Sequence, residues 1–407
     1  MRVAVVAEWY PSRADPVLGF WAHRQALAAR DAGAEVRVLA LRRPIPPLSV
    51  ARQLLHVPPA TGALSRWIAG ARTSLRPMTL DGLDVMAVAF AAPPRPISYG
   101  SWGYWMSVPL GRALDLLYAD WRFDVVHAHC LAPAGHAVAR WVSGRARDAR
   151  PPFVVSAHGP DMIHLADAPI GRRACRAALA AADLVIANSR WAARRCEQIA
   201  GRPLPADVVH LGADLVDPGD ASSNGSLRMV TVAHLVTRKR HEVVLQAMAM
   251  LDPERRPEYL VIGDGPCREG LERLAAQLGV AVRFLGQLPN ADAVARAAAC
   301  DLFVMPGVEE PFGVAYVEAM AAGLPAIGSR GEGGPEDISA AGEGMLLVEP
   351  GDAAGLASLI DRLSTDRDEL RRLGAAARET VAASFTWERC GAQTVAAYRR
   401  ALAARRT

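Results

Sequence analysis

The chain has 407 residues, 51% of them hydrophobic and 22% charged, and a formal net charge of +4. This length is too great for one ordinary core, and the composition is typical of a soluble globular protein, so we expect two domains. A membrane-spanning helix is excluded because no apolar run reaches roughly 18 residues, and residues 1–8 are too short for a signal peptide. The six cysteines show no paired metal-ligand spacing, which indicates reduced thiols in a cytoplasmic protein.

The positive charge is concentrated in the first half of the chain. Residues 1–212 hold 25 arginines and 15 acidic residues, whereas residues 213–407 hold 21 basic and 27 acidic residues. A basic first half suits an anionic lipid or an anionic acceptor, and an arginine-rich solvated surface explains the same counts equally well. Nucleic acid suits it less, because no compact basic and aromatic module is present. Peripheral contact with the inner face of the membrane is therefore an open alternative.

The first half of the chain alternates predicted strands and helices. A strand at residues 3–7 is followed by a helix at 19–32, which ends at Gly33, and by a second strand at 35–41. Further strands are predicted at 124–128, 153–157, 184–187 and 208–211, with a helix after Ala134. This rhythm predicts a parallel sheet with helices on both faces. Residues 44–105 interrupt it as an irregular insertion rich in Pro, Arg and aromatic residues, and such insertions are usually functional or mobile.

A second series of strands and helices begins after a polar segment. Residues 213–226 are the predicted linker, because 217–226 are rich in residues that break helices and strands. Strands are predicted at 229–233, 259–262, 282–285, 302–305, 326–328 and 345–348. The predicted fold class is α/β, with two doubly wound, Rossmann-like domains at 1–212 and 227–385 and a C-terminal helix at 386–407. Such domains would bind a ligand in the cleft between them, outside the carboxyl ends of the strands.

The segment EPFGVAYVE, from Glu310 to Glu318, places two carboxylates eight positions apart. The first lies in a Pro/Gly turn, and the second lies on the helix that follows, which Gly323 and Pro325 end. The amides of residues 312–314 lie at the start of this helix, where unpaired N–H groups and the helix dipole favour an anion. Carboxylates beside an anion site suit a ligand that carries both hydroxyls and phosphates, and a nucleotide sugar is such a ligand.

Lys239 is the only lysine of the chain, beside 45 arginines. It follows the strand at 229–233 and precedes a helix from about His241, so it lies at the carboxyl end of a strand. The use of lysine at this one position suggests that a compact point charge is needed there. A phosphate bound at that strand end would be paired with the ammonium. A solvated lysine retained by chance is the alternative.

These residues lie within motifs that resemble those of one large enzyme family. The stretch 229–350 resembles the nucleotide-sugar domain of the retaining GT-B glycosyltransferases of family 4 (glycosyl transferases group 1) in the order and spacing of its motifs. The motifs are VAHLVTRK at 232–239, GDGP at 263–266, FLG at 284–286, Met305-Pro306, Glu310 to Glu318, EAMAAGLP at 318–325 and Gly333-Gly334. The first half is similar more loosely, through DVVHAH at 124–129 and HGPD at 158–161. The resemblance implies the GT-B fold, an acceptor-binding first domain and a C-terminal helix that crosses back.

The resemblance also implies a role for each matched residue on the donor side. Glu310 would bind hydroxyls of the transferred sugar, and Glu318 would bind the ribose hydroxyls. Lys239 would neutralise the pyrophosphate as it departs. The other implied donor-binding residues are Phe312, Gly313 and Val314, through their amides, with Arg238, His234, Gly263 and Leu285. His234 departs from the family, which usually has Arg or Lys there, so either Arg238 replaces that charge or His234 acts when protonated.

On the first domain, the resemblance implies that His129 reaches the 6-hydroxyl and the reacting face of the sugar, as a catalytic residue beside Glu310 and Lys239. His127 is the alternative. We expect the two histidines to point to opposite sides of their strand, with one of them buried in packing. The expected sugar or acceptor contacts are His158 and Asp161, after the next strand, and Gly19, before the first helix. The aromatic cluster at 99–105 would stack on a sugar ring, enter a lipid interface or simply pack.

We therefore predict a retaining hexosyltransferase that uses a nucleotide diphosphate sugar, with UDP as the expected nucleotide. The acceptor would be a hydroxyl of a glycan, a lipid-linked molecule or a small molecule, in the synthesis of cell-envelope polysaccharide or of a glycosylated natural product. No cofactor or metal is expected, because Lys239 and the helix start supply positive charge. An epimerase or hydrolase on the same plan and a non-catalytic nucleotide-sugar-binding protein are the alternatives.

Overall fold

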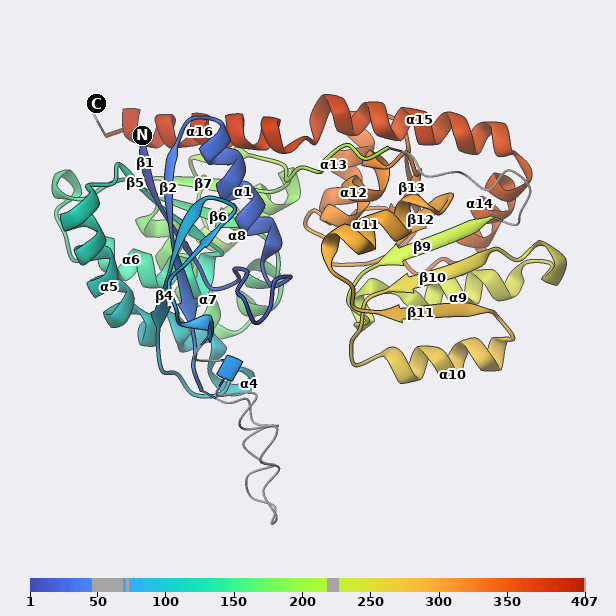
Figure 1. Cartoon of the computed structure of the whole chain (residues 1–407), viewed down its shortest axis with the longest axis horizontal. Coiled ribbons are helices and arrows are strands. Elements are labelled where there is room, and N and C mark those ends of the chain that lie inside the picture. Colours follow the sequence, from blue (N-terminus) through green and yellow to red (C-terminus); the bar gives the residue numbers. More distant parts are fainter. Residues whose placement is uncertain (46–68, 71–72, 218–226, 406–407) are drawn as a thin grey trace, which may run out of the picture. The chain divides into compact units, whose positions relative to one another are not determined.

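A computed structural model describes residues 1–45, 69–70, 73–217 and 227–405. The chain forms two compact units. The first comprises Met1–Val209 with Cys390–Thr407, and the second comprises His210–Arg389. Each unit is built on its own sheet with the strand and helix alternation that the sequence predicts, and Figure 1 traces both along the chain. The predicted linker falls largely outside the described residues, because 218–226 are not among them.

The sheet of the first unit has eight strands in the order β3-β4-β2-β1-β5-β6-β7-β8. Their bounds are β1 (Arg2–Ala7), β2 (Glu35–Arg42), β3 (Met78–Leu80), β4 (Leu83–Ala89), β5 (Val125–His129), β6 (Phe153–Ala157), β7 (Leu184–Ala187) and β8 (Ala206–Val208). All neighbouring strands are parallel except β3 and β4. The carboxyl ends of β1, β5 and β6 therefore lie side by side at one edge of the sheet.

Helices cover this sheet and continue the alternation. Their bounds are α1 (Phe20–Asp31), α4 (Arg95–Ser98), α5 (Trp102–Trp121), α6 (His136–Ser143), α7 (Pro169–Ala181), α8 (Arg190–Ala200) and α16 (Trp387–Ala403). Short helical turns are η1 (Tyr99–Ser101), η2 (Leu131–Gly135), η3 (Arg147–Ala149) and η4 (Asp161–Leu165). The predicted helix at 19–32 agrees with α1.

The C-terminal helix α16 packs on the first unit. Gln25 of α1 donates a hydrogen bond from Nε2 to Oγ1 of Thr394 at 3.1 Å. Gly391 lies so close to α1 that a Cβ there would stand 2.1 Å from the carbonyl oxygen of Ala28. The prediction that the last helix crosses back onto the first domain is therefore confirmed.

The expectation that residues 44–105 are irregular throughout is wrong for its second part. Strands β3 and β4, helix α4 and the start of α5 fall within this range. β4 alternates buried and exposed side chains over Leu83–Met86, where Leu83 and Val85 are buried, and it lies between the edge strand β3 and β2. Residues 46–68 and 71–72 of this segment lie outside the described part.

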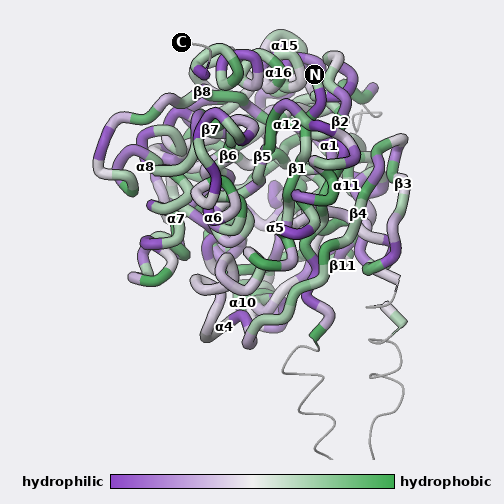
Figure 2. Tube along the Cα trace, turned by 90° about the vertical axis from the view of Figure 1, so that its left-hand side faces the viewer, coloured by the Kyte–Doolittle hydropathy of each residue, from purple (hydrophilic) through white to green (hydrophobic). Residues whose placement is uncertain are grey.

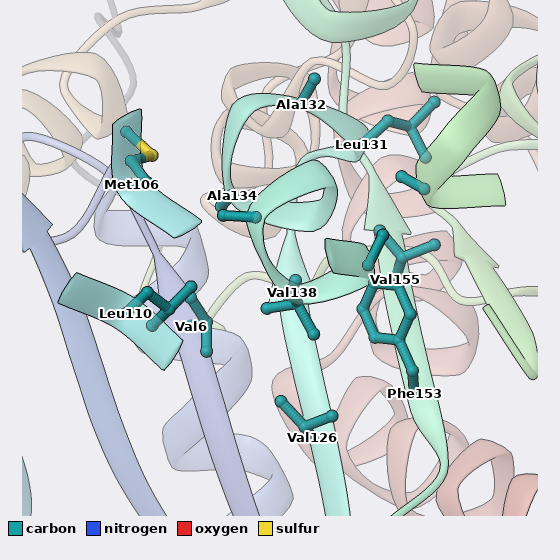
Figure 3. Close-up of a cluster of buried hydrophobic side chains, with 14 of the residues drawn as sticks. Val6, Met106, Leu110, Val126, Leu131, Ala132, Ala134, Val138, Phe153 and Val155 are labelled. Carbon is teal, nitrogen blue, oxygen red and sulfur yellow. The ribbon is translucent and has the colours of Figure 1, made fainter. Parts of the chain in front are cut away.

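A large core of the first unit lies between the sheet and helices α5, α6, α7 and α8. Figure 3 shows its buried side chains, among them Val6, Met106, Leu110, Val126, Val138, Phe153 and Val155. The strands β5, β6 and β7 are buried along their whole length, which explains why their sequences are mostly apolar, with His127, His129 and Ser156 as the polar exceptions. Burying each large apolar side chain stabilises the unit by roughly 1.5–3 kcal/mol.

The sheet of the second unit has six parallel strands in the order β11-β10-β9-β12-β13-β14. Their bounds are β9 (Arg228–Val232), β10 (Glu258–Ile262), β11 (Val282–Gly286), β12 (Leu302–Val304), β13 (Ala326–Ser329) and β14 (Met345–Val348). The helices are η5 (Thr237–Lys239), α9 (His241–Met250), η6 (Pro253–Arg255), α10 (Arg268–Leu278), α11 (Asn290–Ala298), α12 (Val314–Ala321), α13 (Gly333–Ala341), α14 (Ala353–Thr365) and α15 (Arg367–Ser384). Every predicted strand of this half is present, with ends that differ by one residue at most.

Hydropathy varies along each element, as the colouring of the trace in Figure 2 shows. Among the helices of the described residues, none is both long enough and apolar enough to span a bilayer. All six cysteines are free thiols, and five of them are buried.

Candidate active site

Arg238 and Lys239 reach the carboxyl end of β9 because two glycines allow close packing beside it. A Cβ on Gly263 would stand 1.9 Å from the carbonyl oxygen of Ala233, and one on Gly265 would stand 2.5 Å from that of Leu235. The loop after β10 therefore packs directly on the loop after β9. Arg240 then takes a left-handed conformation, with φ of 54°, before α9 begins. The short turn η5 presents the two cations at the strand end.

One carboxylate oxygen of Glu310 forms ion pairs with both Arg238 and Lys239. Arg238 Nη1 lies 2.5 Å and Lys239 Nζ lies 2.7 Å from Glu310 Oε1, and Glu310 is only 3% exposed. Burial lowers the pKa of Lys239, and the neighbouring carboxylate opposes this change. Two cations thus face one buried carboxylate.

The turn that carries Glu310 is held by α13 and the residue before it. The amide of Glu310 donates to Oε2 of Glu332 at 2.8 Å, and the amide of Gly334 donates to the carbonyl oxygen of Glu310 at 3.1 Å. Burial raises the pKa of Glu332. A Cβ on Gly334 would stand 1.6 Å from the carbonyl oxygen of Phe312, so only glycine fits there. Gly313, with φ of 81°, completes the turn into α12.

The start of α12 offers the expected donors. Within the described part of the chain, no hydrogen bond uses the amides of Phe312, Gly313 or Val314. These N–H groups add to the positive end of the helix dipole. Binding of an anion at this turn stays a prediction.

Glu318 lies one turn into α12 and is half-buried. Asn290, the first residue of α11, donates a hydrogen bond from Nδ2 to Glu318 Oε1 at 3.0 Å. Helix α12 ends at Ala321, and Gly323 follows with φ of 85°, as the Gly and Pro signals predict. Glu310 and Glu318 are thus separated by the turn that carries the amides of residues 312–314.

The remaining predicted donor-side residues lie at the ends of neighbouring strands. His234 is exposed, and its Nδ1 stands 3.4 Å from the carbonyl oxygen of Asp264. The amide of Gly263 donates to the carbonyl oxygen of Gly286 at 2.8 Å, and half-buried Leu285 lies in β11. These positions belong to β9, β10 and β11, which are adjacent in the sheet.

An aromatic cluster that the sequence did not indicate supports the turn. The ring of His210 stacks on Phe312 with centroids 5.6 Å apart, and it meets Phe385 edge-on at 5.3 Å. His210 Nε2 lies 3.0 Å from Oδ2 of Asp337, a buried residue of α13. No local pattern joins residues 210, 312, 337 and 385, so only the fold reveals this support.

His210→Ala is expected to lower the free energy of unfolding by about 1–3 kcal/mol, because it removes an aromatic pair and a hydrogen bond. His210→Phe keeps the stacking and loses only the bond to Asp337, so part of the stability should return. Urea unfolding followed by circular dichroism measures both. An unchanged transition for His210→Ala would contradict the supporting role.

On the first unit, the expectation for the two strand histidines is wrong in one respect. Residues two apart in a strand share a face, and the rings of His127 and His129 lie 4.5 Å apart instead of on opposite sides. His127 bonds Tyr398 Oη through Nδ1 at 2.8 Å and Ser156 Oγ through Nε2 at 2.7 Å. Both of its ring nitrogens are therefore occupied within the core.

His129 retains an unused ring nitrogen. Its Nδ1 lies 2.9 Å from Nε2 of His158, while its buried Nε2 has no partner in the described part of the chain. Burial lowers the pKa of His129 to about 3, so the ring is neutral near pH 7. Trp21 covers the pair, with its ring 4.0 Å from that of His158 and 5.6 Å from that of His129.

Asp161 and Gly19 have structural tasks on this unit. Asp161 accepts hydrogen bonds from the amides of Leu131, at 2.7 Å, and Gly159, at 2.9 Å, so each carboxylate oxygen is engaged by the backbone. Burial raises its pKa. A Cβ on Gly19, which has φ of 70°, would stand 2.1 Å from the carbonyl carbon of Trp9. Direct contact of either residue with a ligand stays a prediction.

Comparison with known proteins identifies the family to which the chain is similar. A family model described as Glycosyltransferase Family 4 matches residues 19–217, and one described as Glycosyl transferases group 1 matches residues 219–380. D-inositol 3-phosphate glycosyltransferase of Nocardia farcinica is 32% identical over 318 residues, which are 69% of this chain and 67% of that protein. MMP alpha-(1->4)-mannosyltransferase of Mycolicibacterium hassiacum is 32% identical over 225 residues, so the chain spans about half of that relative, 54% of each.

The fold comparison agrees. The structure of sucrose-phosphate synthase from Thermosynechococcus elongatus superposes with a TM-score of 0.76 at 20% identity, over 99% of this chain and 100% of that one. This similarity establishes the architecture of two parallel sheets. The chain belongs to glycosyltransferase family 4, a family of retaining glycosyltransferases with the GT-B fold.

Proposed function

We propose that this enzyme transfers a hexosyl group from a nucleotide diphosphate sugar, a UDP-sugar in the first instance, to a hydroxyl of an acceptor with retention of configuration. The observation that carries the proposal is the convergence on Glu310. Two cations share one oxygen of this buried carboxylate, and the free amides of residues 312–314 begin two residues later. A donor that carries phosphates and hydroxyls pairs with all of these groups: its phosphates with the cations and the amides, and its hydroxyls with the carboxylate.

The donor side divides the work among few residues. The Lys239 ammonium and the α12 amides receive the pyrophosphate, whose negative charge grows as it leaves. Glu310 accepts hydrogen bonds from hydroxyls of the hexose, and Glu318, one turn into α12, accepts those of the ribose. Arg238, which already pairs with Glu310, supplies the charge that His234 lacks when it is neutral.

The acceptor side uses a neutral histidine. His129 Nε2 is the one ring nitrogen of the His127 and His129 pair without a protein partner in the described structure, which supports its assignment to the hexose. The acceptor oxygen forms the bond to the anomeric carbon on the face from which the phosphate departs. The acceptor proton passes to the departing phosphate oxygen, so no separate protein base is needed.

The acceptor is a hydroxylated glycan, a lipid-linked molecule or a small molecule, in the synthesis of envelope polysaccharide or of a glycosylated natural product.

Peripheral membrane contact is part of the proposal. Tyr104, Trp105 and Val108, on one face of α5, are 43%, 50% and 61% exposed, and Arg140 stacks on Tyr104 at 4.8 Å. In a flotation assay at low salt, anionic liposomes should carry the protein upward, and Trp105→Ser should reduce the fraction of protein that floats. If flotation does not depend on salt, membrane contact is contradicted.

A thermal-shift screen tests the donor directly. Ligands that bind only the folded state stabilise it by about 2.7 kcal/mol at a hundredfold excess over Kd. UDP and UDP-hexoses are expected to raise the melting temperature. A shift with GDP instead would change the nucleotide and keep the function, whereas no shift with any nucleoside diphosphate would contradict it. Epimerisation of the donor sugar would favour an epimerase, and hydrolysis of the donor that an added hydroxylated acceptor does not divert to a transfer product would favour a hydrolase.

A further inference from the structure

Glu8 is an acidic residue that the donor chemistry leaves unexplained. It follows β1 directly, and the pairing of Val6 with Ala128 puts it level with Cys130, just beyond His129. Ligands of parallel α/β sheets bind outside the carboxyl ends of the strands. Glu8 and His129 therefore share one edge of the sheet within the first unit.

A rigid aromatic frame holds the Glu8 carboxylate. Tyr99 donates a hydrogen bond to Glu8 Oε2 at 2.9 Å, and Trp9 Nε1 donates to Tyr99 Oη at 3.3 Å. The guanidinium of Arg95 lies 4.3 Å from the ring centroid of Trp9 and 4.1 Å from that of Tyr99. The backbone of Trp9 is fixed in turn by its contact with Gly19. The frame joins β1 to α4 and η1, so its geometry is built before any ligand arrives.

Two polar groups of this frame are left for a ligand. Arg95 Nη2 stands 3.6 Å from Glu8 Oε1, which is an ion pair without a hydrogen bond. Within the described residues, Arg95 donates no hydrogen bond, and Glu8 Oε1 accepts none. The Glu8 side chain is only 13% exposed and that of Arg95 is 42% exposed. Burial raises the pKa of Glu8 to about 7, and a carboxylate held at such a cost beside a catalytic edge is typical of a functional site.

The charges of the pair select the ligand. Arg95 repels an ammonium, and Glu8 repels a phosphate or carboxylate, so neither a cation nor an anion suits both. A neutral diol suits both, because one hydroxyl donates to the carboxylate while its neighbour accepts from the guanidinium. We propose that Glu8 and Arg95 form the acceptor subsite and bind two vicinal hydroxyls of a ring polyol, a sugar or a cyclitol. This assignment rests on the proposed function, because it requires an acceptor on the first unit.

Saturation-transfer NMR on the full chain with saturating UDP, or with GDP if that nucleotide binds, tests the subsite. The probes are myo-inositol and methyl α-D-glucopyranoside, which carry vicinal hydroxyls, and cyclohexane-1,4-diol, which does not. The wild type is expected to transfer saturation to the first two and not to the third. Glu8→Gln should weaken their binding at least about tenfold, and Tyr99→Phe should weaken it less. Glu35→Gln, an exposed glutamate of the same unit, is the matched control and should match the wild type.

The pH dependence gives a second readout. The groups that face Glu8 are Arg95, Tyr99, Arg42 and the Cys130 thiol. Protonation of the carboxyl removes the negative charge of this hydrogen-bond acceptor and weakens its bond to a hydroxyl, so polyol binding should fall between pH 8 and pH 6 in the wild type and stay flat in Glu8→Gln. Undiminished binding in Glu8→Gln and Tyr99→Phe, both checked for folding by thermal melting, would overturn the subsite. So would the absence of any polyol signal from protein that binds a nucleotide. Calorimetry with UDP and GDP separates the two failures, because a chain that binds neither nucleotide contradicts the proposed function itself.

Discussion

Replacement of Lys239 by Met is expected to lower the rate of hexosyl transfer by about 10²–10³-fold, because one preorganised charge at a departing oxyanion contributes that much. Methionine keeps much of the length and the apolar stem of lysine and removes only the ammonium. The loss should appear in turnover at saturating donor, since the negative charge grows as the bond breaks. Steady-state release of the nucleoside diphosphate measures it.

The matched control is Arg283→Ala, which removes an exposed cation from the same unit and should leave turnover within about twofold. Because Lys239 is the only lysine of the chain, acetylation with an amine-reactive reagent reports on it without interference from other side chains. The Lys239 side chain is 11% exposed, and a bound nucleoside diphosphate should slow modification of its ammonium further. Equal turnover in Lys239→Met, or equal acetylation with and without nucleotide, would contradict the assignment of Lys239 to the pyrophosphate.

Glu310→Gln is expected to lower transfer by about 10²-fold, with little loss of affinity for the free nucleoside diphosphate. The amide keeps the shape of the side chain and cannot neutralise two cations that share one oxygen. Arg238 and Lys239 then remain available to the phosphates, while the hexose loses its charged hydrogen-bond acceptor. Turnover of the nucleotide sugar and calorimetry with the nucleotide alone separate the two effects.

Glu309→Gln serves as the control for this variant. Its side chain is exposed and adjacent in sequence, and its replacement removes the same charge from the same turn. Transfer by Glu309→Gln should stay close to that of the wild type. A common loss in both variants would mean that the charge of the turn, and not the Glu310 carboxylate, is what matters.

Strands such as β1, β7 and β12 were predictable because they are buried on both faces and are therefore apolar runs in the sequence. β4 escaped prediction because it alternates, lies next to the edge strand β3 and follows a Pro- and Arg-rich stretch. The prediction that His127 and His129 point to opposite sides was wrong because residues two apart in a strand place their side chains on the same face.

The residues of the donor site were predictable from the sequence, but the contacts between them were not. The lone lysine and the EPFGVAYVE segment name Lys239, Glu310 and Glu318 from the sequence alone. That Arg238 and Lys239 meet on one oxygen, or that His210 stacks under Phe312, depends on contacts between residues about 70 to 100 positions apart. Glu8 is not among the predicted site residues, although the sequence places its charge directly after the first buried strand.

Retention at the anomeric carbon is tested by the configuration of the first sugar product formed from an α-linked nucleotide hexose, followed by proton NMR before mutarotation. Water serves as the acceptor if no other is supplied, so the test needs no knowledge of the natural acceptor. Transfer with retention predicts an α product, formed by the wild type and at least about a hundredfold more slowly by Lys239→Met. A β product, or equal rates in the two proteins, would contradict it.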